Sequence, residues 1–377
     1  MADFKNIIEY KPEWRELVTF VPNKQKPIYN WFYYKEGFSK ELVEMLLKEF
    51  NVAKGQSVLD PFCGSGTTLL TCKQNGVNAI GFDVLPISVF ASKVKTQGYT
   101  IDELRKEKER IGKIRFEMPS PEKMKEIIPQ YMKRFFSKYA LEDIVFLTRA
   151  INGAPEERVR DFFRLALINT AMKVSYAWKD GAVLKVRKHP TPPMRKLFKR
   201  VCENMIKDVK NYQKGDGFVE VRQCDARVME LENESVDSVI TSPPYYNNID
   251  YTKVYEIENW FVRNIIEKKP LVRSFIGVDD DFEMNVPERS KAYFKDMKKS
   301  LEEMHRVCRS GAKLAIVVGN GYDYISGVVE SDIILSEIAD NIGFDIKRIV
   351  AVTERQALEN RTRKVGTLRE SVIILQA

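Results

Sequence analysis

Short apolar runs alternate with amphipathic stretches along most of the chain. The runs have the length of buried strands, and the stretches between them repeat their apolar residues at helical spacing. The expected strands lie at residues 57–60, 79–83, 218–223, 236–240, 313–318, 346–352 and 371–376, and the clearest helices at 38–50, 67–74, 293–307 and 331–341. About seven strands alternating with helices predict an α/β fold with a doubly wound, mostly parallel sheet.

One long segment departs from this rhythm. From residue 98 to residue 215 the pattern changes to long helical periodicities, as across 159–172. We interpret 98–215 as a helical insertion that follows the second strand and its helix. The sheet domain is then discontinuous and consists of residues 1–97 and 216–377.

The net charge of the chain is unevenly distributed. Overall, 61 Lys and Arg outnumber 53 Asp and Glu, which leaves +8, but the segment 98–215 alone holds 27 basic against 15 acidic residues. Such a concentration favours a polyanionic partner, and we expect the insertion to recognise nucleic acid. The alternative is a solvated helix face in a Lys- and Glu-rich, thermophilic protein. The basic residues expected to contact substrate are Lys185, Arg187, Lys188 and Arg195.

The composition argues against several other classes of protein. No stretch reaches about 18 uninterrupted apolar residues, and the N-terminus has no signal-peptide core, so we expect a cytoplasmic protein without a membrane span. The five cysteines form no CxxC pair, and with only two histidines the spacing of zinc ligands is missing. We therefore expect neither a metal nor a disulfide, and a monomer or weak dimer.

A glycine-rich loop follows the first expected strand. It reads Asp60-Pro61-Phe62-Cys63-Gly64-Ser65-Gly66-Thr67-Thr68 and leads into a helix. The glycines let the backbone approach a ligand, and the N–H groups that open the helix favour an anion such as a methionine-type carboxylate. A loop for NAD, or a plain tight turn, would also explain the glycines. However, neither G-x-G-x-x-G spacing nor a Walker motif is present.

Acidic residues end the next two strands on the edge where such sheets bind ligands. Asp83 lies 17 residues beyond Gly66, a position from which a carboxylate can accept both hydroxyls of a ribose. Asp225 follows the third strand and is placed to accept from an adenine amino group. We expect these residues and their neighbours Val84 and Ala226 to bind a nucleotide-like cofactor.

A two-proline turn, Ser242-Pro243-Pro244-Tyr245, follows the strand at 236–240. The prolines fix the backbone and remove two N–H donors, so the turn presents carbonyl oxygens in one direction. The Ser242 side chain and the Pro243 carbonyl are placed to accept from an exocyclic amine as it attacks a methyl group. Stacking of Tyr245 on a flipped base, worth about 1 to 3 kcal/mol, would offset the flipping cost.

The alternative is that the two-proline turn is only a stiff turn with a buried aromatic side chain. The neighbours expected to contact substrate are Tyr246 and Asn247.

Together, these motifs resemble those of the S-adenosylmethionine-dependent amino-methyltransferases, the superfamily of cytosine-N4 and adenine-N6 enzymes. The loop 60–68 resembles the cofactor loop of that family, 31–39 its upstream cofactor-pocket segment, and 242–245 its catalytic turn. The resemblance implies a class I, Rossmann-like methyltransferase fold, with S-adenosylmethionine as cofactor and S-adenosylhomocysteine as product. It also implies cofactor contacts from Tyr33 and Ser39.

The base and the polymer follow from finer features. Serine at position 242, instead of Asp or Asn, is similar to the cytosine-N4 branch, so we expect methylation of cytosine N4. No separate recognition domain is recognisable, and similar enzymes with this turn include an archaeal type that modifies ribosomal RNA. We therefore expect structured RNA in preference to DNA, with phosphate contacts from Arg361 and Arg363. The alternatives are DNA cytosine-N4 or adenine-N6 methylation, methylation of a small molecule or a protein amine, and a binding protein with a vestigial cofactor fold.

Overall fold

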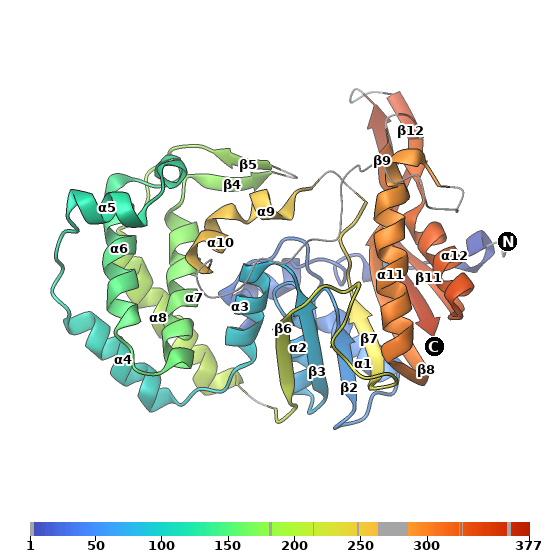
Figure 1. Cartoon of the computed structure of the whole chain (residues 1–377), viewed down its shortest axis with the longest axis horizontal. Coiled ribbons are helices and arrows are strands. Elements are labelled where there is room, and N and C mark those ends of the chain that lie inside the picture. The colour runs from blue at the N-terminus through green and yellow to red at the C-terminus, as the bar shows by residue number, and fades with distance from the viewer. Residues whose placement is uncertain are drawn as a thin grey trace.

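The computed structural model describes residues 4–180, 183–213, 215–246, 249–262, 286–323, 325, 327–359 and 363–377. Figure 1 shows a central sheet with helices on both faces and, beside it, a block of helices. None of the described helices is long and apolar enough to cross a membrane. Within the same ranges, no group of three or more His, Cys, Asp and Glu side chains is arranged to hold a metal ion.

Among the described residues, the central sheet has eight strands in the order β1-β11-β12-β8-β7-β2-β3-β6. They are β1 (Ile8–Tyr10), β2 (Ser57–Asp60), β3 (Asn78–Asp83), β6 (Val219–Gln223), β7 (Val236–Thr241), β8 (Cys308–Gly319), β11 (Asp345–Glu359) and β12 (Arg363–Gln376). All neighbours are parallel, except that β12 runs antiparallel to β8 and β11. The predicted doubly wound α/β sheet is confirmed, with β1 as an additional edge strand.

The strand order reverses between β2 and β7. From β2 the sheet builds outward through β3 to β6, and from β7 it builds the other way to β8. The carboxyl ends of β2 and β7 therefore flank the switch point, where open α/β sheets bind their ligands. Since the glycine loop follows β2 and the two-proline turn follows β7, both motifs lie at this point.

Alternation along the strands builds two apolar layers. Val58 of β2 belongs to a core formed with α1 (Lys40–Glu49) and α2 (Thr67–Gln74). The next residue, Leu59, belongs to the opposite core, formed with α11 (Lys291–Val307) and α12 (Ser331–Ile342). Because both faces are covered, the central strands are nearly continuous apolar runs, which is why the sequence could locate them.

The helical block lies between β3 and β6 in the sequence. It contains α3 (Pro86–Thr96), α4 (Ile101–Lys113), α5 (Pro121–Ile127), a 3₁₀ helix (Gln130–Arg134), α6 (Lys138–Asn152), α7 (Glu157–Val174) and α8 (Met194–Tyr212). A hairpin of β4 (Ala177–Asp180) and β5 (Val183–Val186), which the helical periodicity did not predict, connects α7 to α8. One apolar core joins these helices to Trp31, whose ring centroid lies 5.4 Å from that of Phe162.

Shorter elements complete the fold. After the two-proline turn, α9 (Tyr251–Val254) packs against β5 and α10 (Glu256–Val262) packs against α3. β11 and β12 continue past the end of β8 as a long hairpin, which rises above the sheet in Figure 1. The remaining elements are β9 (Gly321–Asp323), β10 (Gly327–Val329) and 3₁₀ helices at Phe4–Ile7, Pro12–Trp14, Val21–Gln25, Tyr29–Trp31 and Glu288–Ser290.

Candidate active site

Hydrogen bonds tie the ends of β2 and β7 together. The Thr241 hydroxyl donates to Oδ1 of Asp60 at 2.7 Å, although these residues are 181 positions apart in the chain. The Thr68 hydroxyl donates to the Ile240 carbonyl at 3.3 Å. The glycine loop and the two-proline turn are therefore held beside each other.

A cavity of about 590 Å³ opens at this junction, which is the size of a small-molecule site. Besides the two motifs, its walls include residues 34–38, the start of α9 and Glu370. The predicted residues that line it are Asp60, Pro61, Phe62, Gly64, Ser65, Thr67, Asp83, Val84, Ala226, Ser242, Pro243, Pro244 and Tyr245. The other predicted residues from the described part of the chain do not line it, namely Tyr33, Ser39, Gly66, Thr68, Lys185, Arg187, Lys188, Arg195, Asp225 and Tyr246.

Left-handed backbone conformations shape the glycine loop. Gly64 has a φ of +50° and Gly66 a φ of +76°. A Cβ atom at Gly64 would lie 2.8 Å from the Tyr34 ring, and one at Gly66 would lie 2.7 Å from the Ser92 hydroxyl. α2 then begins at Thr67 without a side-chain cap on its first N–H groups. These N–H groups suit the carboxylate of a methionine-type ligand, as the sequence predicts.

Two buried carboxyl groups face the cavity. Asp83 accepts the Gly64 N–H at 2.9 Å and the Leu85 N–H at 2.8 Å. Burial raises the pKa of Asp83 to about 6, even though these hydrogen bonds oppose the shift. Burial likewise raises the pKa of Asp60 to about 7, against the hydrogen bond from Thr241. Each carboxylate has lone pairs left to accept from ligand hydroxyls, so the donor and acceptor set fits a ribose-containing cofactor.

A buried lysine donates hydrogen bonds to the backbone of the glycine loop and of the segment before Tyr34. Lys95 of α3 donates to the Ser65 carbonyl at 3.0 Å and to the Phe32 carbonyl at 3.4 Å. Burial lowers the pKa of Lys95 to about 7. Lys95 thus links the loop to the segment that precedes Tyr34. Sequence reasoning missed it, because a lysine in an amphipathic helix usually faces solvent.

The tyrosine in the N-terminal wall of the cavity is Tyr34 and not the expected Tyr33. Tyr34 stacks on Tyr255, with ring centroids 5.1 Å apart. Tyr33 is 44% exposed and packs edge-on against Phe20. The segment 31–39 therefore contributes to the site, but through the neighbouring side chain.

Ser39 has a structural task instead of the expected cofactor contact. Its side chain is fully buried and accepts the Leu42 N–H at 3.2 Å, which caps the start of α1. Capping of α1 thus accounts for this serine.

A buried ion pair packs against the ring of Tyr255. Lys179 of β4 and Glu258 of α10 approach to 2.7 Å, and both side chains are almost inaccessible to solvent. The Lys179 ammonium also lies 3.2 Å from the centroid of the Tyr255 ring, whose hydroxyl donates to Glu36 at 2.5 Å. The β4–β5 hairpin is thereby connected to the wall of the cavity.

The two-proline turn is held by hydrogen bonds to its surroundings. The Ser242 hydroxyl donates to the Val317 carbonyl at 3.1 Å, and the Tyr293 hydroxyl donates to the Pro244 carbonyl at 2.8 Å. Among the described residues, no group donates to the carbonyl of Pro243. The turn therefore keeps the Ser242 lone pairs and the Pro243 carbonyl as acceptors.

Tyr245 is fixed from two sides. Its hydroxyl donates to Oε1 of Glu370 at 2.9 Å, and its ring packs so closely on Gly319 that a Cβ atom there would lie 2.6 Å away. Burial raises the pKa of Glu370. Glu370 lines the cavity but was not predicted as a site residue, since in the sequence it only precedes the last buried strand.

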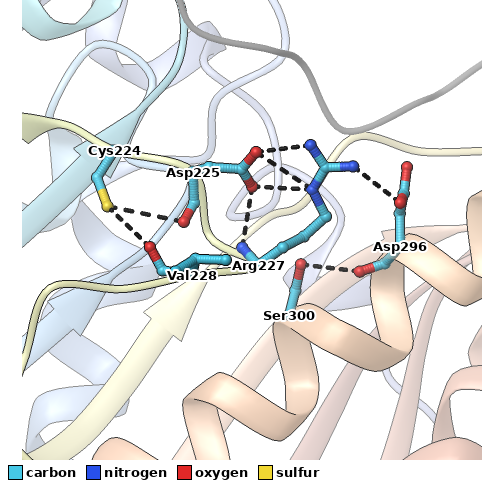
Figure 2. Close-up of polar contacts among 6 residues, drawn as sticks. All are labelled: Cys224, Asp225, Arg227, Val228, Asp296 and Ser300. Carbon is cyan, nitrogen blue, oxygen red and sulfur yellow. Dashed lines mark hydrogen bonds and ion pairs between the residues drawn. The ribbon is translucent and has the colours of Figure 1, made fainter.

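Asp225 does not turn its carboxylate into the cavity as expected. Figure 2 shows its two oxygens facing the Arg227 guanidinium, with Nη2 to Oδ2 at 2.6 Å and Nε to Oδ1 at 3.0 Å. Arg227 also donates to Asp296 of α11 at 2.9 Å, and these carboxylates raise the pKa of the guanidinium. The cavity wall at this point is formed by the neighbours Cys224 and Ala226.

The predicted substrate contacts are dispersed. The ring of Tyr246 is buried against Tyr293 and Phe294, so the expected contact with substrate is corrected to a packing role. Arg195 pairs with Asp143 at 2.9 Å within the helical block. The exposed Lys185, Arg187 and Lys188 lie on or just after β5. Asn247, Arg361 and the side chain of Arg363 lie outside the described residues.

The switch-point cavity, the uncapped start of α2 and the acceptors of the two-proline turn define an S-adenosylmethionine-dependent methyltransferase. The comparisons with known proteins add the family. A family model described as DNA methylase, of the N6 and N4 type, matches residues 6–88. Over these residues the chain is similar to the amino-methyltransferases of the N6 and N4 type.

Curated relatives match nearly the whole chain. Type II methyltransferase M.BsoBI of Geobacillus stearothermophilus is 27% identical and covers 96% of this chain and 87% of its own length. M.AvaI of Nostoc is 27% identical, with coverages of 94% and 86%, and M.MjaII of Methanocaldococcus jannaschii is 22% identical, with 84% and 77%. A solved methyltransferase structure from Aquifex aeolicus, at 12% identity and a TM-score of 0.30, is too distant to bear on the fold.

Proposed function

We propose that this enzyme transfers a methyl group from S-adenosylmethionine to the exocyclic amine of a base in duplex DNA, at N4 of cytosine, after the base has flipped into the cavity. The observation that carries the proposal is the hydrogen bond from the Ser242 hydroxyl to the Val317 carbonyl. While this bond is made, Ser242 offers its lone pairs to the substrate. An amine with two N–H groups matches that surface.

The comparisons support DNA as the polymer. The family model is described as DNA methylase, and the similar curated proteins are named Type II methyltransferases. The expectation of RNA rested on the absence of a separate recognition domain. The alignment with M.BsoBI runs over 454 positions but covers 96% of the 377 residues of this chain, so that relative contains residues that this chain lacks. The comparisons give the RNA preference no support.

Different residues would bind the cofactor and the reacting amine. The helix start at Thr67 would hold the carboxylate of the cofactor, and Asp83 its ribose hydroxyls. When bound, S-adenosylmethionine would supply an electrophilic methyl group. As the base nitrogen forms its bond to this methyl, the bond from the methyl carbon to sulfur breaks and S-adenosylhomocysteine is released, and the nitrogen then gives up one of its two protons to solvent. Ser242 and the Pro243 carbonyl would accept the two N–H bonds and draw the amine nitrogen toward tetrahedral geometry.

Tyr245 would provide the surface on which the flipped base stacks. Its hydroxyl is fixed by Glu370 and its ring by Gly319, so little rotamer entropy remains to be lost when a base binds. Stacking on a pre-fixed ring offsets part of the cost of unstacking the base from the duplex.

Mass spectrometry of nucleosides tests this proposal. Purified protein is incubated with S-adenosylmethionine and either genomic DNA or ribosomal RNA, and the digested nucleosides are analysed. We expect N4-methylcytosine in DNA. N6-methyladenine in DNA would contradict the choice of base, and methylation of RNA alone would contradict the choice of polymer. Wild-type turnover by Tyr245→Ala would contradict the assignment of the site.

A further inference from the structure

The β4–β5 hairpin presents an unusual outer surface. Its cross-strand register pairs Trp178 with Lys185 and Asp180 with Val183, which places these four side chains on one face. Trp178 is 50% exposed and Val183 is 52% exposed. Nothing in the core requires a half-exposed tryptophan at this position, because the opposite face, with Ala177 and Leu184, already packs on the helical block.

The hairpin is also locally basic. Arg187 and Lys188 follow β5, are exposed, and form no ion pair among the described residues. Lys185 lies over the Trp178 ring, with its ammonium 5.5 Å from the centroid, and pairs with Asp180. An exposed aromatic side chain on a hairpin that also carries unpaired cations is the composition of a surface that binds nucleic acid.

The position of the hairpin relates this surface to the cavity. β5 packs against α9, and Tyr251 and Thr252 of α9 line the cavity. Figure 1 shows the hairpin alongside α9 and α10 on the side of the sheet where the strands end. The isolated two-stranded hairpin is anchored there by the buried Lys179–Glu258 pair.

We propose that the outer face of the β4–β5 hairpin docks on duplex DNA beside the target base. Trp178 stacks on the base pair next to the vacated position, and Arg187 and Lys188 contact phosphates. Apolar side chains that insert at a base step are a known way to stabilise distorted DNA, and a two-stranded ribbon has the width of the major groove. This inference rests on the proposed methylation of DNA and names the element that engages it.

The first test is the affinity for a short duplex that the wild-type enzyme methylates. We expect Trp178→Ala to weaken binding about tenfold, since stacking on one base is lost. Trp178→Phe should restore most of the affinity. The matched control is Phe218→Ala, which removes an aromatic side chain that is 66% exposed. Phe218 directly precedes β6 and so lies at the amino end of that strand, whereas the cavity lies at the carboxyl ends. All three variants should bind S-adenosylmethionine like the wild type, which verifies folding.

The second test is the salt dependence of the same binding. Arg187→Gln combined with Lys188→Gln should make the plot of log affinity against log salt shallower by about 2, one unit for each phosphate contact. The control pair, Lys48→Gln with Lys54→Gln, makes the same change of charge near the amino end of β2 and should leave the slope unaltered.

The outcomes separate the two proposals. If the wild type methylates DNA but Trp178→Ala binds as tightly as Phe218→Ala, or both pairs of charge variants change the slope equally, the hairpin is not the docking element and the proposed function stands. If the wild type does not methylate DNA at all, the proposed function is wrong and the docking inference falls with it.

Discussion

Ser242 shows how a single hydroxyl can be limited to one role. With its proton donated to Val317, the oxygen acts as an acceptor in the cavity. We expect Ser242→Ala to lower kcat about a hundredfold, because one acceptor for the reacting amine is lost in the transition state. The affinity for S-adenosylmethionine should not change. Single-turnover methylation of DNA measures the first effect and calorimetry the second.

Ser235→Ala is the matched control for this prediction. Ser235 donates to the Glu232 carbonyl at the opposite end of β7 from Ser242, so its removal should leave the rate unchanged. Equal rates for Ser242→Ala and Ser235→Ala would contradict the acceptor role.

The raised pKa of Asp83 predicts how the affinity for S-adenosylmethionine depends on pH. Burial raises its pKa to about 6, so at pH 7.5 it is ionised and can accept from ribose hydroxyls. Below pH 6 the carboxyl binds a proton that must be released before it can accept two hydroxyls. Affinity for S-adenosylmethionine should therefore be constant above pH 8, where Asp60 is also ionised, and fall by up to tenfold per unit below pH 6.

Asp83→Asn separates this effect from that of Asp60, which also titrates in the cavity. The variant should bind weakly, and any pH dependence that remains belongs to Asp60, whose pKa is about 7. A wild-type affinity that stays constant from pH 7.5 to pH 5 would contradict the role assigned to Asp83. Isothermal titration calorimetry at a series of pH values provides the measurement.

A site residue could be predicted from the sequence when a motif at a strand end positions it. It could not be predicted when the local backbone conformation or a neighbouring side chain decides where it points. Gly64, Asp83 and Ser242 follow directly from strand ends, so the sequence places them in the cavity correctly. Tyr34 could not be distinguished from Tyr33, because the chain there lacks the periodicity that assigns faces. Asp225 occupies the expected loop, but its partner Arg227, two residues further on, turns the carboxylate away.

At the scale of elements, the start of α2 depends on a glycine that no other residue can replace. Gly66 combines a left-handed φ with a Ser92 side chain that blocks any Cβ atom, and Ser92 itself donates to the Gly64 carbonyl at 2.9 Å. We expect Gly66→Ala to lower the free energy of unfolding by about 2 to 5 kcal/mol, from backbone strain plus overpacking. Cofactor binding should be lost with it.

Gly55→Ala is the control for steric effects. Gly55 has a similar φ of +81°, but no atom lies within 4 Å of its would-be Cβ, so only the backbone strain of about 1 to 2 kcal/mol should appear. Urea denaturation measures both variants. Equal losses would mean that contact with Ser92 does not constrain the loop.

Strands buried on both faces were predicted closely, and so was the edge strand β6, of which only Val221 is buried. β2, β3 and β7 were located within one residue because each contains a short run of buried apolar side chains. The β4–β5 hairpin was missed because its strands have four residues each and include Lys179, Asp180 and Lys185, which do not resemble a strand. β1 was missed because three residues at an edge pair only through the distant β11.

At the scale of the whole molecule, the helical block and the sheet are less separate than the segment 98–215 suggests. The apolar core of the block also contains Trp31 from the N-terminal region and Tyr255 and Ile257 from beyond the two-proline turn. Such long-range packing leaves no local signal in the sequence. The sequence pattern therefore separates the segment 98–215 from the sheet domain more completely than the packing does. The block instead shares side chains with the wall of the cofactor cavity.

The pairing of Lys179 with Glu258 has a consequence for how the two ligands influence each other. Lys179 belongs to the hairpin and lies on Tyr255, which stacks on Tyr34, whose ring covers Gly64 of the cofactor loop. If these contacts couple the two ligand sites, the effect of each ligand on the affinity for the other must be the same. S-adenosylhomocysteine should tighten DNA binding by at least about fivefold, and DNA should tighten cofactor binding by the same factor.

Replacing the pair as a unit tests this interdependence. Lys179→Met with Glu258→Gln leaves no unpaired buried charge, so the fold should persist while the two affinities become independent. Fluorescence anisotropy of labelled DNA, with and without S-adenosylhomocysteine, gives the ratio directly, and an unchanged ratio would contradict the coupling. If the ratio approaches one, this buried ion pair is what makes the enzyme hold its methyl donor and its DNA as a single cooperative complex.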